Sequence, residues 1–525
     1  MGRCPLLIPL AVLIALILIC DSLGMRKPQE PPSFGEGRYA AYVLSVREAS
    51  TAGQLAVVEV DTVDGHTVRP FKARVHFVSD FPDVRAGNRV SFAGKLRPLA
   101  AAPDIPDVVD MQATLRREGV TASVTVARDS VLSVTATVTM REWFASLNED
   151  VYSRLRRCPI SPEAVSVLSA MLLGRTDMIT DDMRMTFSAA GLSHLLALSG
   201  MHVGIIAMIV AVALWPFYLG RHTRTRLVLT IAALWFYAAF TGFLPSVTRA
   251  VIMATAYMGG RILQRRSSAL NSLCLAAFVI LLFNPEDLYA PGFQLSFSAV
   301  LGIILFYPLL NRVDRRNHPL LYTIASYPAL SLSAMALTGI VAAFHFHTYP
   351  LYFLVANLLV VPLVPLLVFS GVVTLLLNAD AATDFLVGMI DLVADFTASL
   401  PGSVITGLYP PAWLVLLLSA LLCLLAVAVT MRSRFLMLES VILLVAVAVG
   451  CIAYPRREYP AEAEYVVEEY RSTQRIIVRG DSCIILTDAK TGAEREEIEE
   501  CYGVILRDFV ARRHLQPPTV RRLDN

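Results

Sequence analysis

The sequence predicts a polytopic α-helical membrane protein with a small all-β domain near its N-terminus and a small α+β tail at its C-terminus. Of its 525 residues, 55% are hydrophobic and 17% are charged, against about 25% charged in an ordinary soluble domain. The charge is also unevenly distributed, since residues 136–454 hold 18 basic and 15 acidic residues while the shorter segment 36–135 holds 12 of each. This pattern excludes a disordered chain and a water-soluble multidomain enzyme. The net charge of +2 indicates no partner.

The first element is an apolar run from Pro5 to Cys20 that follows Arg3. A run of this length suits either a signal peptide or an uncleaved anchor. No small-residue cleavage site follows it, and Ile19 is too bulky to precede a lipobox cysteine. We therefore expect residues 1–24 to form a membrane anchor whose N-terminus lies inside the cell.

Residues 36–135 are typical of a small β-barrel. Turn signals such as Asp64-Gly65 separate short stretches that are rich in β-branched residues. There are five such stretches, at Tyr39–Val46, Leu55–Val60, Thr67–Val78, Arg89–Leu96 and Val120–Val126. Five strands favour an OB-fold, a barrel that often binds single-stranded nucleic acid through a basic groove and stacked aromatic rings. This domain is neutral overall and its phenylalanines suit a core equally well, so the sequence supports the barrel better than nucleic-acid binding.

Residues 140–190 predict amphipathic helices at the membrane interface. The stretch from Met140 to Cys158 places apolar residues along one stripe. Ser161-Pro162-Glu163 combines an N-cap, a proline at the first helical position and an acidic first turn, and Gly174 ends that helix. Thr180 opens a third helix, which we expect to end at Gly191.

Ten further apolar segments follow, and together with the anchor they predict about eleven membrane crossings. They lie at about 193–219, 227–243, 247–260, 269–284, 293–310, 319–343, 350–376, 384–400, 411–430 and 436–453. Arginines are concentrated in four connections, at residues 221–226, 261–266, 312–316 and 432–434. All four connections fall on the cytoplasmic side if Arg3 lies inside, as the positive-inside rule requires. The weakest crossing is 384–400, because Asp384, Asp391 and Asp395 line one of its faces.

This topology places both soluble domains, and several polar residues of the membrane segments, on the outer side. A polar or charged group at membrane depth costs about 2.5–3.5 kcal/mol at the centre and less near an end. The residues are His194, Arg249, Gln294, His345 and His347. We expect them to line one outward-facing polar vestibule; the alternative is that Arg249 simply extends to the lipid headgroups.

Four sequence motifs occur in order along these segments. They are GLSHLLALSGMHVG at 191–204, TGFLPSVTRA at 241–250, Asn284-Pro285 followed by GFQLSF at 292–297, and HFHTYPL at 345–351. Together they resemble the ComEC competence family over about 160–455, and the neutral barrel resembles the family's extracellular OB-like domain. The resemblance implies that residues 191–453 form a channel in the inner membrane of a bacterium that passes single-stranded DNA into the cytoplasm during natural transformation.

The histidines and glycines of the first motif also have simple physical interpretations. Gly200 and Gly204 form a small-xxx-small pair that lets another helix approach closely. His194 and His202 would share one ridge of a helix. Because no Cys or Glu lies at a supporting spacing, we expect packing or hydrogen bonding from these imidazoles and no metal.

Arg249 is the best candidate for a phosphate contact, because it is permanently charged and donates two parallel hydrogen bonds. Conduction requires weak, multiple contacts, which the neutral groups of Gln294, Ser296 and Ser199 would supply beside a single arginine. A purely structural polar network would use the same residues equally well.

The sequence departs from the longer family members at its C-terminus. Those members end in a metallo-β-lactamase-like domain, thought to be the nuclease for the non-transported strand, which needs a His-x-His-x-Asp-His cluster. Residues 455–525 contain one histidine, His514, and predict a few strands and a helix near 494–507. We therefore expect no catalytic residue, no metal and no cofactor here. The expected partners are the lipid bilayer, single-stranded DNA, a separate DNA receptor, a separate nuclease, and a cytoplasmic motor or single-strand-binding protein.

Two other functions stay open at this stage. A secondary transporter for a small solute would show internal repeats and paired broken helices; no repeat is evident, although Pro362 and Pro365 would break the 350–376 segment. A reduced membrane scaffold that no longer transports would explain the missing nuclease. A pore within one chain and a pore at a homodimer interface fit the sequence equally.

Overall fold

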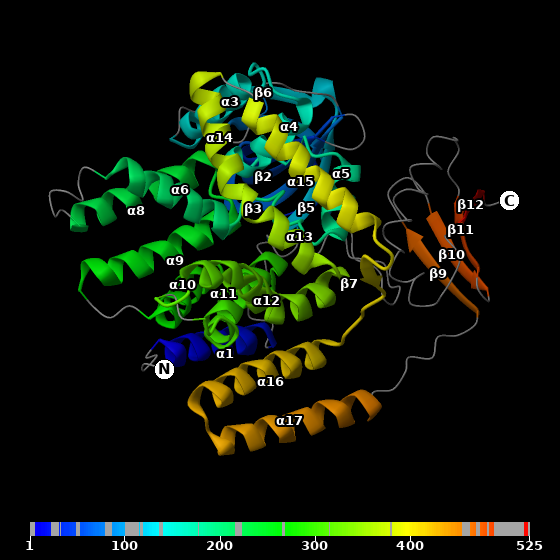
Figure 1. The fold of residues 1–525 in the computed structure, drawn as a ribbon. Coiled ribbons are helices and arrows are strands. Elements are labelled where there is room, and N and C mark those ends of the chain that lie inside the picture. The colour runs from blue at the N-terminus through cyan, green and yellow to red at the C-terminus, as the bar shows by residue number, and fades with distance from the viewer. Residues whose placement is uncertain are drawn as a thin grey trace. The chain divides into compact units, whose positions relative to one another are not determined.

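The chain divides into two compact units in the computed structural model (Figure 1), and each is described by itself. One unit comprises residues 1–25 and 140–453, and the other comprises residues 26–139 and 454–525. The structure describes residues 6–22, 31, 33–48, 53–78, 84, 87–99, 115, 119–135, 140–176, 178–215, 223–264, 268–313, 316–378, 381–453, 462–468, 473–479, 482–487 and 519–522. The tail helix expected near 494–507 lies outside the described residues.

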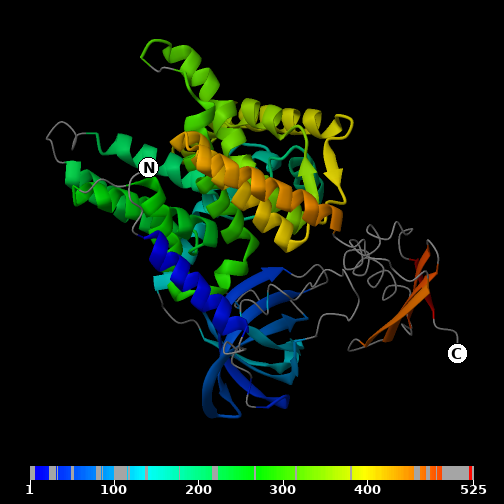
Figure 2. The same cartoon turned by 90° about the horizontal axis from the view of Figure 1, so that it is seen from below.

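The N-terminal soluble domain is a closed five-stranded barrel, shown in blue and cyan in Figure 2. Its strands are β1 (Gly35–Glu48), β2 (Gln54–Val63), β3 (His66–Phe77), β4 (Arg89–Pro98) and β5 (Val120–Val126). The pairing order β1-β2-β3-β5-β4 closes because β4 also pairs with β1, and β3 and β5 run parallel. All five predicted strands are confirmed. A short sixth strand that the sequence analysis missed, β6 (Val131–Thr135), pairs with β4.

The barrel is held together by alternating residues that point inwards. Phe71 and Phe77 of β3 and Phe92 of β4 are 2%, 0% and 0% exposed, and the ring of Phe92 lies 6.5 Å from that of Phe77. These rings therefore belong to the core and not to a surface on which bases would stack. The β2–β3 hairpin forms where expected, since Asp64 and Gly65 both have positive φ, 49° and 81°, as a two-residue type I′ turn requires.

The C-terminal tail contains a four-stranded sheet. Its strands are β9 (Glu462–Glu468), β10 (Thr473–Arg479), β11 (Ser482–Thr487) and β12 (Thr519–Arg522). The first three correspond to the strands expected in the tail and form an antiparallel meander, and β12 adds to β11 in parallel.

The other unit is helical. Its helices before the polar motifs are α1 (Leu7–Ser22), α3 (Met140–Leu155), α4 (Pro162–Leu168), a π-helical turn η2 (Ser169–Leu173) and α5 (Asp181–Ala189). The polar motifs lie among α6 (Gly200–Ala213), α8 (Thr223–Phe240), α9 (Pro245–Ile262), α10 (Ala269–Phe283), η3 (Pro285–Tyr289), α11 (Pro291–Leu310) and α12 (Pro319–Phe346). The last helices are α13 (Phe353–Val360), α14 (Leu363–Leu377), α15 (Ala381–Ser399), α16 (Ala412–Met431) and α17 (Arg434–Ala453). Two three-residue strands, β7 (Thr348–Pro350) and β8 (Val404–Thr406), pair with each other.

Within the part of the chain that the structure describes, three helices, α11, α12 and α16, are long and apolar enough to cross a membrane. The pair α13 and α14 makes a fourth candidate span that bends by 43°, at the break where the sequence places Pro362. Four shorter apolar helices of the described chain, α1, α4 with η2, α6 and α10, fall below the span length. The expected number of about eleven crossings is therefore not confirmed.

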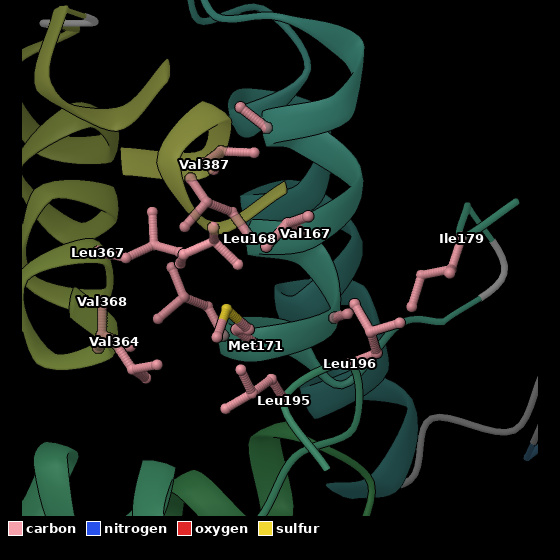
Figure 3. Close-up of a cluster of buried hydrophobic side chains, with 14 of the residues drawn as sticks. Val167, Leu168, Met171, Ile179, Leu195, Leu196, Val364, Leu367, Val368 and Val387 are labelled. Atoms are coloured by element: carbon pink, nitrogen blue, oxygen red, sulfur yellow. The ribbon is translucent and has the colours of Figure 1, made fainter. Parts of the chain in front are cut away.

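The first large core is built around α4 and η2 (Figure 3). All ten residues from Ala164 to Leu173 are buried, and Leu168 and Met171 lie close to Leu367 of α14 and Val387 of α15. A helix that is buried on every side is a core element, so residues 164–173 are not the amphipathic interfacial helix that the sequence predicts.

The ends of these helices match the sequence signals. The Ser161 hydroxyl accepts a hydrogen bond from the Ala164 amide (3.2 Å), Pro162 is the first helical residue, and Gly174 ends η2 with φ 77°. The Thr180 hydroxyl caps α5 in the same way. Distant side chains bind the last carbonyls of η2, which local sequence signals do not indicate: Tyr237 donates to Leu172 (3.0 Å) and Asn148 donates to Leu173 (3.1 Å).

Candidate functional site

The polar motifs meet through a series of contacts between helix ends. The Cβ position of Gly200, at the start of α6, lies 3.7 Å from Cβ of Ala250 in the first turns of α9. Arg249, which directly precedes Ala250 in α9, places its Nη2 atom 3.5 Å from the Cβ position of Gly292, at the start of α11. The starts of α6, α9 and α11 are therefore neighbours.

The remaining contacts close the series. Gln294 of α11 lies 2.8 Å from His345 at the end of α12, measured from Oε1 to Nε2. The chain then passes through β7, where Pro350 lies against Gly191, with 3.1 Å between the Pro350 Cγ atom and the Cβ position of Gly191. Gly191 has φ 76°, a conformation in which a side chain is strained, and it opens the segment that leads back to α6. The four sequence motifs thus form one continuous circuit.

Arg249 is the central charged residue of this circuit. Its side chain is only 7% exposed, and among the described residues its Nε atom has no hydrogen-bond partner. The guanidinium group points towards the first turn of α11, which argues against a side chain that extends to lipid headgroups. A buried cation needs a compensating charge, and the carboxylate of Asp287 in η3 acts on it electrostatically.

Asp287 is itself held in a partly buried position. Burial raises its pKa above the ordinary value of 3.8, while the charge of Arg249 and a hydrogen bond from Asn284 (2.9 Å) oppose that rise. The sequence analysis missed this residue. An acidic side chain in the short polar stretch between two apolar segments, 269–284 and 293–310, was the available signal.

Gln294 joins η3 to the end of α12. Its amide nitrogen donates to the Leu288 carbonyl (2.9 Å), so its amide oxygen accepts from Nε2 of His345. This arrangement assigns the ring proton of His345 to Nε2. Ser296, two residues further along α11, is half-buried, and its hydroxyl makes no hydrogen bond among the described residues. Two residues turn a helix by about 200°, so Ser296 does not share the face of Gln294.

Ser199 and His202 form a local pair at the start of α6. The Ser199 backbone N–H donates to Nδ1 of His202 (3.2 Å), and the Ser199 hydroxyl lies 3.0 Å from the same nitrogen. The neutral ring therefore carries its proton on Nε2, which is buried and has no partner among the described residues. His202 is 1% exposed, so this pairing fixes both its tautomer and its orientation.

The predicted ridge shared by His194 and His202 is wrong. Residues 192–199 form turns, and α6 begins only at Gly200, so the two histidines do not lie on one helix face; His194 is exposed. At Gly204, no atom lies within 4 Å of the Cβ position, whereas Gly200 contacts α9. Among the described residues, no group of three His, Cys, Asp or Glu side chains is arranged to hold a metal.

His347 lies apart from this circuit. It ends α12 in the left-handed conformation, with φ 58°. Its Nδ1 atom lies 3.1 Å from the Leu408 carbonyl, and its ring packs against Tyr409 at 4.4 Å. These contacts tie the end of α12 to the segment that follows β8.

The motifs can now be compared with known proteins. Residues 171–432 match the family model described as Competence protein. This part of the chain belongs to the Competence protein family. The resemblance found in the sequence is thus confirmed, and every residue predicted for the vestibule lies within this Competence domain.

Several curated proteins are similar to part of this chain. ComE operon protein 3 of Bacillus subtilis (strain 168) is 28% identical over 284 residues, which cover 52% of this chain and 35% of that protein. Uncharacterized protein YcaI of Escherichia coli (strain K12) is 28% identical over 38% of this chain and 27% of its own length. Competence protein ComA of Neisseria gonorrhoeae is 28% identical over 27% of this chain and 21% of its own length. The chain therefore spans less than half the length of each of these relatives. No solved structure matches it.

Proposed function

We propose that this protein is a membrane channel that passes single-stranded DNA into the cytoplasm during natural transformation. One similar protein, Competence protein ComA, and the matching family model, Competence protein, both carry competence in their names. The family model covers residues 171–432, where the four motifs meet. The observation that carries the proposal is the position of Arg249, the one arginine that is buried among the described residues, at the junction of three helix ends.

This chemistry suits a moving phosphodiester strand. A guanidinium group recognises a phosphate by two parallel hydrogen bonds, but a channel needs contacts that release as readily as they form. Asp287 lowers the net positive charge at the site, and the amide of Gln294 and the imidazole of His345 provide neutral donors and acceptors. Such a site attracts each phosphate without trapping it.

We further propose that the Competence domain lies in the inner membrane of a bacterium, with the vestibule, the barrel and the tail on the outer side. The arginine-rich connections support this orientation. The barrel is proposed to be an OB-fold, because its five strands close in the order β1-β2-β3-β5-β4 with β3 parallel to β5. Since Phe71, Phe77 and Phe92 fill its core, any contact of the barrel with DNA would use other side chains.

The proposed partners follow from the transport reaction. DNA must reach the outer face, which requires a receptor, and one strand must be removed, which requires a nuclease on this or another chain. A cytoplasmic motor or single-strand-binding protein would pull the strand inwards. The pore would form either within one chain or between the two chains of a homodimer.

A secondary transporter for a small solute is the second candidate, and the bend between α13 and α14 is the observation in its favour. Transporters of this kind pair two broken helices in corresponding halves. The described residues contain one bent pair, so the channel is favoured.

A transformation assay tests the proposal in the strain that encodes the protein. Deletion of the gene should abolish uptake of labelled donor DNA into a nuclease-resistant cytoplasmic pool, and the wild-type gene should restore it. Arg249→Ala, inserted in the membrane at the wild-type level, should reduce uptake strongly, and Arg249→Lys should restore part of it because the charge returns without the paired donors. Normal uptake in the deletion strain would reject the channel, and would leave the transporter or a non-transporting scaffold.

A further inference from the structure

The N-terminal helix is packed into the helical unit. Ile17 of α1 is 3% exposed and lies in a cluster with Ile280 and Leu281 of α10 and Phe293 of α11. Figure 1 shows α1, in dark blue, alongside these helices. Three turns of α1 contribute to the same cluster, through Leu10, Leu13 and Ile14. A membrane tether alone would not need this packing.

A polar contact joins the C-terminal end of α1 to the candidate site. The hydroxyl group of Tyr289, the last residue of η3, donates to the Asp21 carboxylate at 2.7 Å. A hydrogen bond to a charged acceptor is stronger than one between neutral groups. The contact joins residues that are 268 positions apart in the sequence, so it fixes the position of η3 relative to the end of α1.

The position of η3 matters because η3 supplies two of the groups that define the site. Its Asp287 carboxylate acts on the Arg249 guanidinium, and its Leu288 carbonyl accepts from Gln294. Leu288 also contacts the cluster that contains Ile17. A displacement of η3 would therefore change the charge balance at Arg249 and the orientation of Gln294 together.

We propose that Asp21 and Tyr289 are positioning residues for the polar site, and that α1 is a structural part of that site. The contact between them holds η3 so that the Leu288 carbonyl faces Gln294 and the Asp287 carboxylate stays close enough to act electrostatically on Arg249. The consequence for DNA uptake rests on the proposed function; the consequence for the order of η3 does not.

Hydrogen exchange followed by mass spectrometry tests the contact in the full chain reconstituted in lipid nanodiscs. Asp21→Ala and Tyr289→Phe should each accelerate exchange in peptides covering residues 284–294 by about threefold to tenfold, the effect of losing one hydrogen bond. The double variant should add little to either single one, because both remove the same contact. Tyr307→Phe is the matched control, because that tyrosine lies on α11 away from η3 and its hydroxyl contacts Tyr322 instead.

A conservative variant separates positioning from general damage. Asp21→Asn keeps an acceptor oxygen for Tyr289, so exchange and DNA uptake should stay close to wild type, whereas Asp21→Ala should reduce uptake. Unchanged exchange in both Asp21→Ala and Tyr289→Phe overturns the positioning role. If Asp21→Ala accelerates exchange but leaves DNA uptake normal, the positioning role holds and the proposed role of the polar site in DNA transport is wrong.

Discussion

Replacing Gln294 by methionine tests the hydrogen bonds that connect η3 to α12. Methionine has nearly the same length and volume but neither donates to the Leu288 carbonyl nor accepts from His345. Each lost hydrogen bond costs about 1 kcal/mol, and a buried partner left unpaired costs up to about 3 kcal/mol. Because Leu288 and His345 are half-buried, water compensates in part. We expect a loss of about 2 kcal/mol in the free energy of unfolding.

Equilibrium unfolding in mixed detergent micelles, with increasing fractions of a denaturing detergent, measures this loss. A change of about 2 kcal/mol shifts the folding equilibrium by about thirtyfold. Ser296→Ala is the matched control on the same helix, since Ser296 is half-buried and its hydroxyl makes no hydrogen bond among the described residues. The effect of this variant should stay within about 0.5 kcal/mol. If Gln294→Met is no less stable than Ser296→Ala, the bridge between η3 and α12 does not hold these elements together.

Three further predictions concern packing, capping and pH. Gly302→Ala should destabilise the protein by more than about 1 kcal/mol, because the new Cβ would overlap a backbone carbonyl of α12. Gly204→Ala is the control, because its new Cβ would meet open space, and it should be neutral or slightly stabilising. The same unfolding assay measures both variants. Ser161→Ala should lower the stability of the protein more than Thr180→Ala. Both variants lose an N-cap hydrogen bond that contributes about 1 kcal/mol, but only Ser161 also donates to a carboxylate at the start of α15 (2.9 Å). Equal decreases in melting temperature would contradict this. The pKa of the Asp287 carboxyl group is raised above 3.8 in the folded state, so the folded protein binds the carboxyl proton more tightly than the unfolded chain does. The free energy of unfolding should therefore fall as the pH rises from 3.8 through the folded-state pKa. Asp287→Asn should remove that part of the pH dependence.

The local signals in the sequence predicted local structure well. The N-cap at Ser161, the left-handed glycine at Gly174 and the turn at Asp64-Gly65 depend only on neighbouring residues, and the structure has all three. The alternation of β-branched residues located all five barrel strands for the same reason. The strand order was not predictable, because the parallel β3–β5 pairing joins segments more than 40 residues apart.

Hydrophobicity was a weaker guide in the helical unit. An apolar run is compatible with a crossing, a half-length helix or a buried core element. The apolar segment 193–219 predicts one crossing, yet residues 193–197 form turns and bends that place His194 off the helix carrying His202. Asp287 and Tyr289 escaped notice because their roles depend on contacts with Arg249 and Asp21, which lie far away in sequence.

The buried helix formed by α4 and η2 has a consequence for biosynthesis. Its ten consecutive buried residues end at Leu173, whereas part of their packing surface begins at Val364 of α14, about 190 residues later in the chain. A ribosome adds about 5–20 residues per second, so this apolar helix waits for about 10–40 s before α14 has been made. During that interval lipid or the insertion machinery must shield it, and the speed of translation through α6 to α13 becomes a factor in the yield of folded protein.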